Sequence, residues 1–262
     1  MKKGRILFLY GLTSCGKTTV AERMRRMCSS VLYVSSNDIF HDMIAGKFFR
    51  RDFWGAVAET IGAQYVAVRG MAEAGFDVAV DGMLLDLPEY RERFGMSNLE
   101  LVKSLFGPFD PLFVRFDCPL EELRRRNILR GDRGEFQSEE QAAKMTKDPP
   151  ADLVIDALTT FPDEAAARIL GAAGMGFQYE IDPEERAFLL DGILSPFGAS
   201  PAETATEDGI FTAALRLPDR DCAIRAGGEL CRRGYRPEPE TSEGEILLAR
   251  SPADLCRLVF GQ

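Results

Sequence analysis

The sequence is poor in the residues that build metal centres and disulfide frameworks. Its 262 residues include one histidine, His41, and six cysteines among which no C-x-x-C pair occurs. With a single histidine and cysteines that are widely scattered along the chain, neither a zinc site nor a disulfide framework is expected. The cysteines are Cys15, Cys28, Cys118, Cys222, Cys231 and Cys256. We expect reduced, partly buried thiols, as is usual in a cytoplasmic protein.

Long apolar segments are also absent from the sequence. No apolar run approaches the ~18 residues that suggest a membrane span. The apolar residues 6–10 are too few for the core of a signal peptide. Hydrophobic residues still make up 45% of the chain, which is ordinary for a protein with real cores. We therefore expect a cytoplasmic location without membrane contact, and a length that fits two domains of ~100–200 residues each.

Positive charge is scarce in the last third of the chain. Lys and Arg number 9 against 16 Asp and Glu over residues 172–262, whereas 23 face 25 over residues 1–171. The formal net charge of the whole chain is −9. An acidic second part argues against a nucleic-acid partner, and the first part keeps its arginines available for a polyphosphate.

What the sequence does contain is a phosphate-binding motif near its start. Residues 11–18, G-L-T-S-C-G-K-T, match the pattern G-x-x-x-x-G-K-[ST]. An apolar strand, 6–10, precedes the motif and a helical segment, 19–27, follows it, which is the context that phosphate binding requires. Backbone N–H groups of such a loop and the start of the next helix bind phosphate oxygens. The residues that we expect at the nucleotide are Gly11, Ser14, Cys15, Gly16, Lys17, Thr18 and Thr19.

Two residues of this motif, and one aspartate elsewhere, have separate expected roles. Lys17 would reach the β- and γ-phosphates of ATP and take part in catalysis, and the Thr18 hydroxyl would bind Mg²⁺. Asp81 lies in a predicted strand, 76–82, and an aspartate at the end of a strand beside a phosphate loop usually holds the water shell of Mg²⁺. The predicted metal ligands are therefore Thr18 and Asp81.

A further candidate for catalysis, Asp38, follows the predicted strand 31–35. Ligands of open parallel sheets bind beyond the carboxyl ends of the strands. A carboxylate there can accept the proton of a hydroxyl that attacks the γ-phosphate. Spacing alone leaves open a second role for Asp38, which is to cap the following helix. His41 lies one helical turn later and either contacts the substrate or is a polar surface residue.

Five arginines are concentrated between residues 124 and 133. Arg126 and Arg130 are four residues apart on one helix face, and Arg133 follows after a turn. Arginine suits bidentate phosphate contacts and the charge that develops during transfer. We expect these three on a mobile lid, with Arg126 and Arg130 binding the nucleotide and Arg133 acting in catalysis. The other two are expected on a solvated helix face that pairs with nearby glutamates.

Five predicted strands alternate with helices over the first two thirds of the chain. This alternation predicts a parallel sheet covered by helices on both faces, the α/β architecture of P-loop NTPases. The strands are expected at 6–10, 31–35, 76–82, 111–118 and 152–156. The predicted P-loop kinase domain spans residues 1–171.

Residues 175–262 predict a small acidic α+β domain after a linker of small residues, 171–176. The expected order is strand 177–181, a helix capped by Asp182, loop 198–206, strand 210–217, helix 219–233, strand 245–250, and a final helix that starts at the capping pattern 251–254. One expectation for this domain is docking of a protein partner or of a second copy of the chain. The other is recognition of the acceptor.

Residues 4–171 resemble the chloramphenicol phosphotransferase-like kinases, which are P-loop enzymes akin to shikimate and adenylate kinases. The resemblance rests on the phosphate loop, the Asp38 segment, the segment 68–81 and, above all, the block from D-C-P-L-E-E-L to R-G-D-R at 117–133. It implies that Asp38 is the general base and that the arginines near R-G-D-R line the nucleotide site. Gln141, Asp152 and Asp156 also fall at spacings that the family shows.

The chain departs from the family pattern at residues 135–137, at Thr146 and at Ala151. These departures concern the acceptor more than the nucleotide, so chloramphenicol itself is not implied as the substrate. The sequence predicts an ATP-dependent phosphotransferase that moves the γ-phosphate to a hydroxyl of a small molecule, with ATP and Mg²⁺ as its cofactors. Two other hypotheses stay open: a zeta-toxin-like kinase of a nucleotide sugar, and an interaction protein whose first domain is a nucleotide-controlled switch.

Overall fold

The computed structural model of the protein describes residues 3–131, 133–207, 209–238, 244–251 and 254–260. The chain forms two compact units, Met1–Tyr179 and Glu180–Gln262, each with its own sheet. The first unit extends to Tyr179 because Met175 packs in its core and Phe177 forms an isolated bridge with Cys28. Among the helices of the described residues, none is long and apolar enough to cross a membrane.

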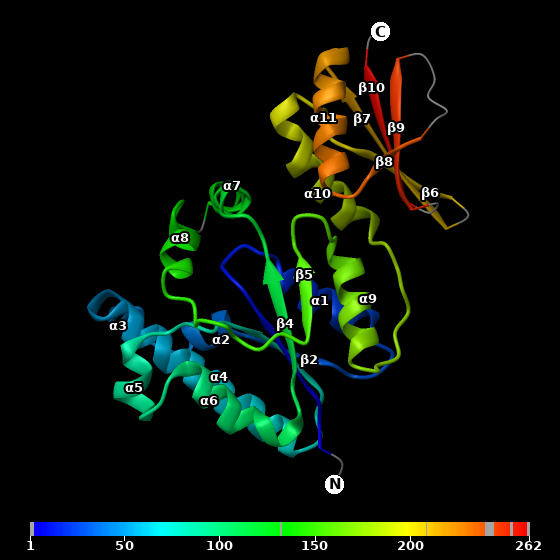
Figure 1. The fold of residues 1–262 in the computed structure, drawn as a ribbon. Helices are drawn as coiled ribbons and strands as arrows, with labels where there is room; N and C mark the ends of the chain where they lie inside the picture. The colour runs from blue at the N-terminus through cyan, green and yellow to red at the C-terminus, as the bar shows by residue number, and fades with distance from the viewer. Residues whose placement is uncertain (1–2, 132, 208, 239–243, 252–253, 261–262) are drawn as a thin grey trace. The chain divides into compact units, whose positions relative to one another are not determined.

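The first unit is built on a five-stranded parallel sheet, as the alternation of strands and helices predicts. Its strands lie in the order β2-β3-β1-β4-β5, so the chain passes from one side of β1 to the other between β3 and β4 (Figure 1). Ligands of such sheets bind at the carboxyl ends of the strands beside this change of direction. The strands are β1 (Ile6–Tyr10), β2 (Tyr33–Ser36), β3 (Val78–Gly82), β4 (Leu112–Asp117) and β5 (Leu153–Asp156).

Helices cover both faces of this sheet because alternate side chains of β1 enter two separate cores. Leu7 and Leu9 lie in the core that α1 and α9 cover, whereas Phe8 and Tyr10 lie in the core that α4, α5 and α6 cover. The helices are α1 (Lys17–Met27), α4 (Phe53–Glu73), α5 (Pro88–Phe94), α6 (Asn98–Phe106) and α9 (Pro162–Ala172). The apolar side chains of β1 therefore pack against the helical layers on both faces of the sheet.

The sequence predicts the short helices of the first unit incompletely. The sequence predicts loops at 47–51 and around Pro88 and Gly95, and a helical segment at 134–147. Instead, α3 (Lys47–Arg51) and α5 form in the first two places, and α8 (Gln137–Ala142) is shorter than the predicted segment. α5 has Pro88 in its first turn and ends at Gly95, which has a φ of 70°. These two residues are start and stop signals for a helix, but each is equally common in loops. Two further helices, α2 (Asn37–Asp42) and α7 (Leu120–Arg130), and one 3-10 turn, η1 (Gly107–Phe109), complete the unit.

The second unit is a small α+β domain, as the sequence predicts. Its sheet has the order β6-β7-β10-β9-β8, in which β10 is parallel to β7 and the other neighbours are antiparallel. Its elements are α10 (Pro183–Leu194), η2 (Ser195–Phe197), β6 (Glu203–Glu207), β7 (Ile210–Leu217), α11 (Arg220–Arg232), β8 (Arg236–Pro237), β9 (Glu245–Ser251) and β10 (Asp254–Phe260). Asp182 and Asp219 cap α10 and α11 through their side chains.

Three predictions for this part of the chain are wrong. Segment 177–181 forms only the bridge at Phe177, and the expected loop 198–206 contains most of β6. The final helix is instead β10, in which Asp254, Cys256 and Leu258 are buried. Burial at every second residue is the pattern of a strand. The segment therefore forms a strand, although the helix-capping pattern 251–254 precedes it. Pro252 and Ala253 of that pattern lie outside the described residues.

A buried ion pair joins α10 to β10 within the second unit. The Arg186 guanidinium contacts the Asp254 carboxylate, and both side chains are at most 3% exposed. The Tyr235 hydroxyl donates a hydrogen bond of 3.2 Å to the same carboxylate. A buried charge that loses its partner is strongly destabilising, because neither water nor another charge replaces the partner.

We expect Arg186→Leu to destabilise the second unit by about 3–5 kcal/mol, since Asp254 then stays buried without its partner. Amide hydrogen exchange along β10 measures this loss locally, which is preferable to a single melting temperature in a chain of two units. The double variant Arg186→Leu/Asp254→Leu should recover part of the protection. Unchanged exchange in the single variant would show that the pair does not stabilise the unit.

Candidate active site

The phosphate loop connects β1 to α1 with a backbone that two glycines make possible. Gly11 passes so close to β4 that a Cβ atom there would lie 2.7 Å from the Phe116 carbonyl oxygen. Gly16 caps α1 with a φ of 94°, a left-handed conformation that side chains disfavour. Ser14 is left-handed as well, with a φ of 61°. The loop is therefore a tight, strained turn in front of a helix N-terminus, which is the geometry that binds phosphate.

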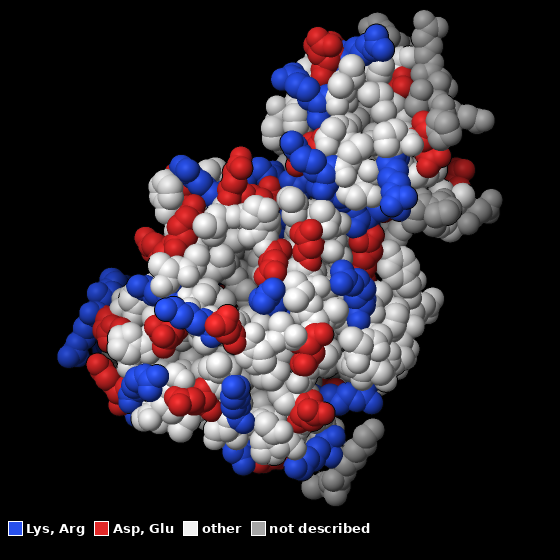
Figure 2. Space-filling view, in the orientation of Figure 1, with Lys and Arg blue, Asp and Glu red and all other residues white. Residues whose placement is uncertain are grey.

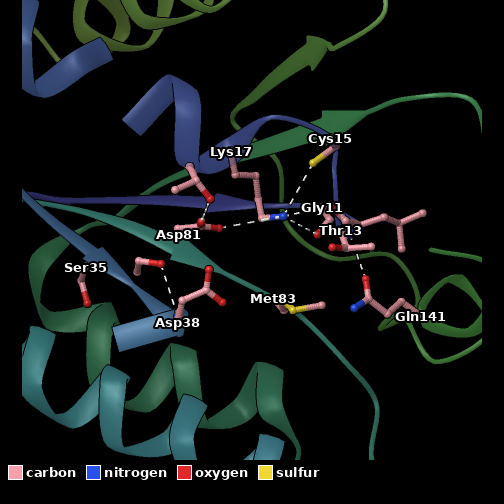
Figure 3. A network of polar contacts seen from close by, with 12 residues as sticks. Gly11, Thr13, Cys15, Lys17, Ser35, Asp38, Asp81, Met83 and Gln141 are labelled. Carbon is pink, nitrogen blue, oxygen red and sulfur yellow. Dashed lines mark hydrogen bonds and ion pairs between the residues drawn. The ribbon is translucent and has the colours of Figure 1, made fainter. Parts of the chain in front are cut away.

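Lys17 lies folded across the mouth of this loop (Figure 3). Its ammonium group donates to the carbonyl oxygens of Leu12 at 2.9 Å and Gly11 at 3.0 Å, and it lies 3.9 Å from the Asp81 carboxylate. The Cys15 sulfur is 3.7 Å away, and burial raises the pKa of this thiol. The thiol is therefore neutral, and Asp81 is the carboxylate that balances the charge of Lys17.

Thr18 and Asp81 place two hard oxygen donors side by side. The Thr18 hydroxyl donates a hydrogen bond to the Asp81 carboxylate at the end of β3. Mg²⁺ is usually held by one or two protein oxygens together with water and substrate phosphates. The described residues contain no group of three or more His, Cys, Asp and Glu side chains that could hold a metal alone. The pair therefore fits a Mg²⁺ ion whose other ligands come from a polyphosphate.

A glutamine that the sequence analysis did not single out holds the ends of β2 and β3 together. Gln64 of α4 is fully buried, and its amide group donates to the Ser35 carbonyl at 2.8 Å and to the Asp81 carbonyl at 3.1 Å. These bonds fix the strand end that carries Asp81 beside the strand that leads to Asp38. The signal in the sequence that points to Gln64 is its position as a polar residue within a largely apolar stretch of helix.

Asp38 lies in the first turn of α2 with its carboxylate exposed. The cap of this helix is Ser36, whose hydroxyl accepts the Asp38 N–H at 3.3 Å, so the alternative in which Asp38 is the cap is wrong. His41 is half-buried, its Nε2 lies 2.8 Å from the Asn37 amide nitrogen, and its ring contacts Phe49. Burial lowers the pKa of His41, which favours the neutral ring at pH 7.

The three arginines of the expected lid lie in different environments. Arg126 reaches the phosphate loop, because its guanidinium donates to the Ser14 carbonyl at 3.4 Å and to the Ala157 carbonyl at 2.8 Å. The Arg133 guanidinium lies 3.5 Å from the Asp38 carboxylate. Arg130 is exposed in the last turn of α7. Asp132, between them, lies outside the described residues. Arg124 and Arg125 pair with Glu135 and Glu122 respectively.

A buried polar network joins α7 and α8 to the loop. Asn127 is fully buried, and its carbonyl accepts the Ser14 hydroxyl at 2.6 Å while its amide donates to Ser138 at 3.0 Å. Ser138 donates to the Thr13 carbonyl at 3.4 Å, and Gln141 accepts the Thr13 N–H at 2.8 Å. Asn127 and Ser138 cannot be recognised from the sequence, because polar residues inside a charged segment give no sign of burial before the helices pack.

Replacing Asn127 with leucine is expected to weaken ATP binding by roughly tenfold. The change removes the three hydrogen bonds of the side chain, to Ser14, Ser138 and the Glu135 carbonyl, and leaves the part-buried Ser14 hydroxyl and the buried Ser138 hydroxyl short of partners, at a cost of about 1–3 kcal/mol. Isothermal titration with ATP and Mg²⁺ measures the loss. Ile128→Ala on the exposed face of the same helix is the control. Equal ATP affinity in wild type and Asn127→Leu would show that the loop does not need this support.

A pocket of about 440 Å³ opens beside the first residues of the loop. Gly11 and Leu12 form one wall, the end of β4 and the following residues form another, and Met145 and Asp156 complete it. A ligand whose phosphates lie in the loop can extend into this space. Asp38 is not among the residues that line this pocket.

The first unit matches a known protein family. The sequence model of chloramphenicol phosphotransferase-like proteins matches residues 4–173. A search of curated proteins found no match. The match to the family covers the whole parallel sheet with both of its helical layers, and it leaves the second unit outside.

Solved structures of kinases are also similar to about two thirds of the chain. A sugar kinase from Janibacter sp. HTCC2649 is 18% identical, with a TM-score of 0.48, over 66% of this chain and 96% of its own. The APS kinase of Mycobacterium tuberculosis in complex with AMPPNP and APS is 18% identical, with a TM-score of 0.46, over 66% and 99%. The shikimate kinase of Bacteroides thetaiotaomicron is 16% identical, with a TM-score of 0.43, over 65% and 98%.

Proposed function

Because the chain belongs to the chloramphenicol phosphotransferase-like family, we propose that its first unit is an ATP-dependent kinase that phosphorylates a hydroxyl of a small molecule. The observation that carries the proposal is the placement of two groups at one edge of the sheet. Lys17 and the Thr18–Asp81 pair lie at the phosphate loop, and the Asp38–Arg133 pair lies at the end of β2. A donor site and an acceptor site are thus side by side.

The donor side binds and orients the triphosphate of ATP. Loop N–H groups and the start of α1 receive the phosphates, and Lys17 exchanges its carbonyl partners for the β- and γ-phosphate oxygens. Thr18 and Asp81 would hold Mg²⁺, which neutralises charge on the phosphates when it is bound. Arg126 anchors α7 to the loop through the Ser14 carbonyl and to the residue after β5 through the Ala157 carbonyl.

The acceptor side carries out the proton transfer. The acceptor oxygen attacks the γ-phosphorus, the bond from that phosphorus to the ADP oxygen breaks, and the Asp38 carboxylate takes the hydroxyl proton. Arg133 offsets negative charge on the phosphoryl group as it moves. The ion pair of 3.5 Å between Arg133 and Asp38 keeps both groups at the same place before the substrates bind.

The surface around Asp38 favours an acceptor with an apolar body. His41, Phe49, Phe53 and Trp54 form a chain of ring contacts across α2, α3 and the start of α4. Phe53 is exposed, whereas Phe49 and Trp54 pack partly against the core. Exposed apolar surface beside a site is typical of ligand-binding surfaces. Figure 2 shows Lys and Arg side chains gathered where α3 lies, so anionic substituents on the acceptor are also compatible with this surface.

An acceptor screen tests the proposal. Purified protein is given Mg-ATP with single alcohols from a panel of hydroxyl-bearing antibiotics, sugars, nucleotide sugars and aromatic alcohols, and the release of ADP is followed. We expect at least one acceptor to raise ADP release and to gain a phosphomonoester that mass spectrometry detects. Binding of ATP without acceptor-dependent ADP release across the panel, together with a partner whose affinity depends on nucleotide, would instead favour the interaction protein.

A further inference from the structure

The side chain of Gln141 contacts the phosphate loop at Thr13, and only the oxygen of its amide group forms a hydrogen bond there. Gln141 lies in α8, is 6% exposed, and accepts the Thr13 N–H through Oε1 at 2.8 Å. A backbone N–H can only donate, so the oxygen of the amide must face Thr13 and the NH₂ group must face away from it. Among the described residues, this NH₂ group donates no hydrogen bond.

The unused NH₂ group is directed toward the space where the reaction would take place. In Figure 3 the amide nitrogen of Gln141 lies on the side of the loop that faces Met83 and Asp38. The Lys17 ammonium binds the carbonyl of Leu12, the residue next to Thr13. Because the lysine of such a loop reaches the β- and γ-phosphates, Thr13 borders the terminal end of the triphosphate.

The position of Gln141 is fixed by the network that surrounds it. Ser138, one turn earlier in α8, contacts the Thr13 carbonyl, and Asn127 joins Ser138 to Ser14. The helix that carries the Gln141 amide is therefore held to Thr13 directly, and to Ser14 through Asn127. A donor held in this way needs little reorganisation when charge develops on a phosphoryl group, which is the condition for effective stabilisation.

We infer that the Gln141 amide donates a hydrogen bond to a γ-phosphate oxygen and so reads the presence of the third phosphate. The inference rests on the proposed function, because it needs a nucleoside triphosphate in the loop. Gln141 then has two roles at once: its oxygen braces Thr13, and its nitrogen contacts the group to be transferred. A purely structural brace would make only the first contact.

Affinities for ADP and for AMPPNP, each with Mg²⁺, separate the two roles. Gln141→Glu keeps an oxygen for the Thr13 N–H and removes the donor, and Gln141→Met removes both with no added charge. We expect both variants to lose at least about tenfold in AMPPNP affinity, the loss expected for one hydrogen bond to a charged group. The dissociation constant of ADP divided by that of AMPPNP should therefore fall by the same factor. Gln178→Glu, at an exposed position of the same unit, is the matched control.

Each outcome decides for or against the inference. A lower ratio in both Gln141 variants, with the wild-type ratio in the control, supports the contact to the γ-phosphate. Unchanged ratios, or equal losses for ADP and AMPPNP, overturn it and leave the proposed kinase function in place. Failure of the wild-type protein to bind either nucleotide overturns both the inference and the proposed function.

Discussion

Asparagine in place of Asp38 is expected to lower acceptor-dependent phosphoryl transfer by about 10²–10⁴-fold, the usual contribution of a general base. The amide keeps the shape of the carboxylate but cannot accept the hydroxyl proton at neutral pH. ATP binding should be unchanged, because Asp38 follows β2 whereas the loop follows β1. Turnover with the acceptor found in the screen and titration with AMPPNP measure the two effects.

The neighbouring Asp42→Asn provides the control for Asp38→Asn. Asp42 is the last residue of the same helix and is exposed, so it tests the loss of one negative charge without the base. The ion pair between Asp38 and Arg133 is partly exposed and contributes little to stability, so unfolding should not explain the result. Wild-type turnover by Asp38→Asn would remove the base assignment and leave the donor site intact.

Alanine in place of Lys17 is expected to abolish measurable transfer, with a loss of at least about 10²–10³-fold from one preorganised donor to the developing charge. ATP affinity should fall as well, because the ammonium reaches the phosphates in the ground state. In the free protein the change also leaves the Leu12 and Gly11 carbonyls without this donor and Asp81 without its cation. Transfer rates and ATP titrations measure both losses.

An exposed lysine of the same unit provides the control for Lys17→Ala. Lys103 of α6 lies outside the candidate site, and Lys103→Ala removes the same charge. Hydrogen exchange of β1 amides shows whether the Lys17 variant keeps its fold. Normal transfer by a folded Lys17→Ala variant would contradict the role of the phosphate loop in the reaction.

The parts of the fold that the sequence predicts well are those with strong local signals. β1 coincides with the five apolar residues before the loop, and β7 with the alternating segment 210–217. The sequence also predicts a long helix over residues 52–74, and α4 starts at the Asp52 cap and ends before Gly75, which has a φ of 95°. Caps, left-handed glycines and hydrophobic periods act within a few residues, so they can be recognised without the rest of the chain.

The parts of the fold and of the candidate site that cannot be predicted from the sequence depend on contacts between distant segments. β10 forms because it pairs with β7 and β9, although a serine–proline capping pattern precedes it. Asn127 and Gln64 become buried only when α7 and α4 pack against the loop and the strand ends. The meeting of Arg133 with Asp38, 95 residues apart, likewise needs the folded chain.

Titration of the purified protein with ATP, with and without Mg²⁺, tests the central claim most directly. We expect one binding site per chain, with ATP bound more tightly in the presence of Mg²⁺ than in its absence, and with binding strongly weakened in Lys17→Ala but not in Lys103→Ala. If the wild-type protein binds no purine nucleoside triphosphate in the presence of Mg²⁺, the phosphate loop does not act as a donor site and the proposed reaction is excluded.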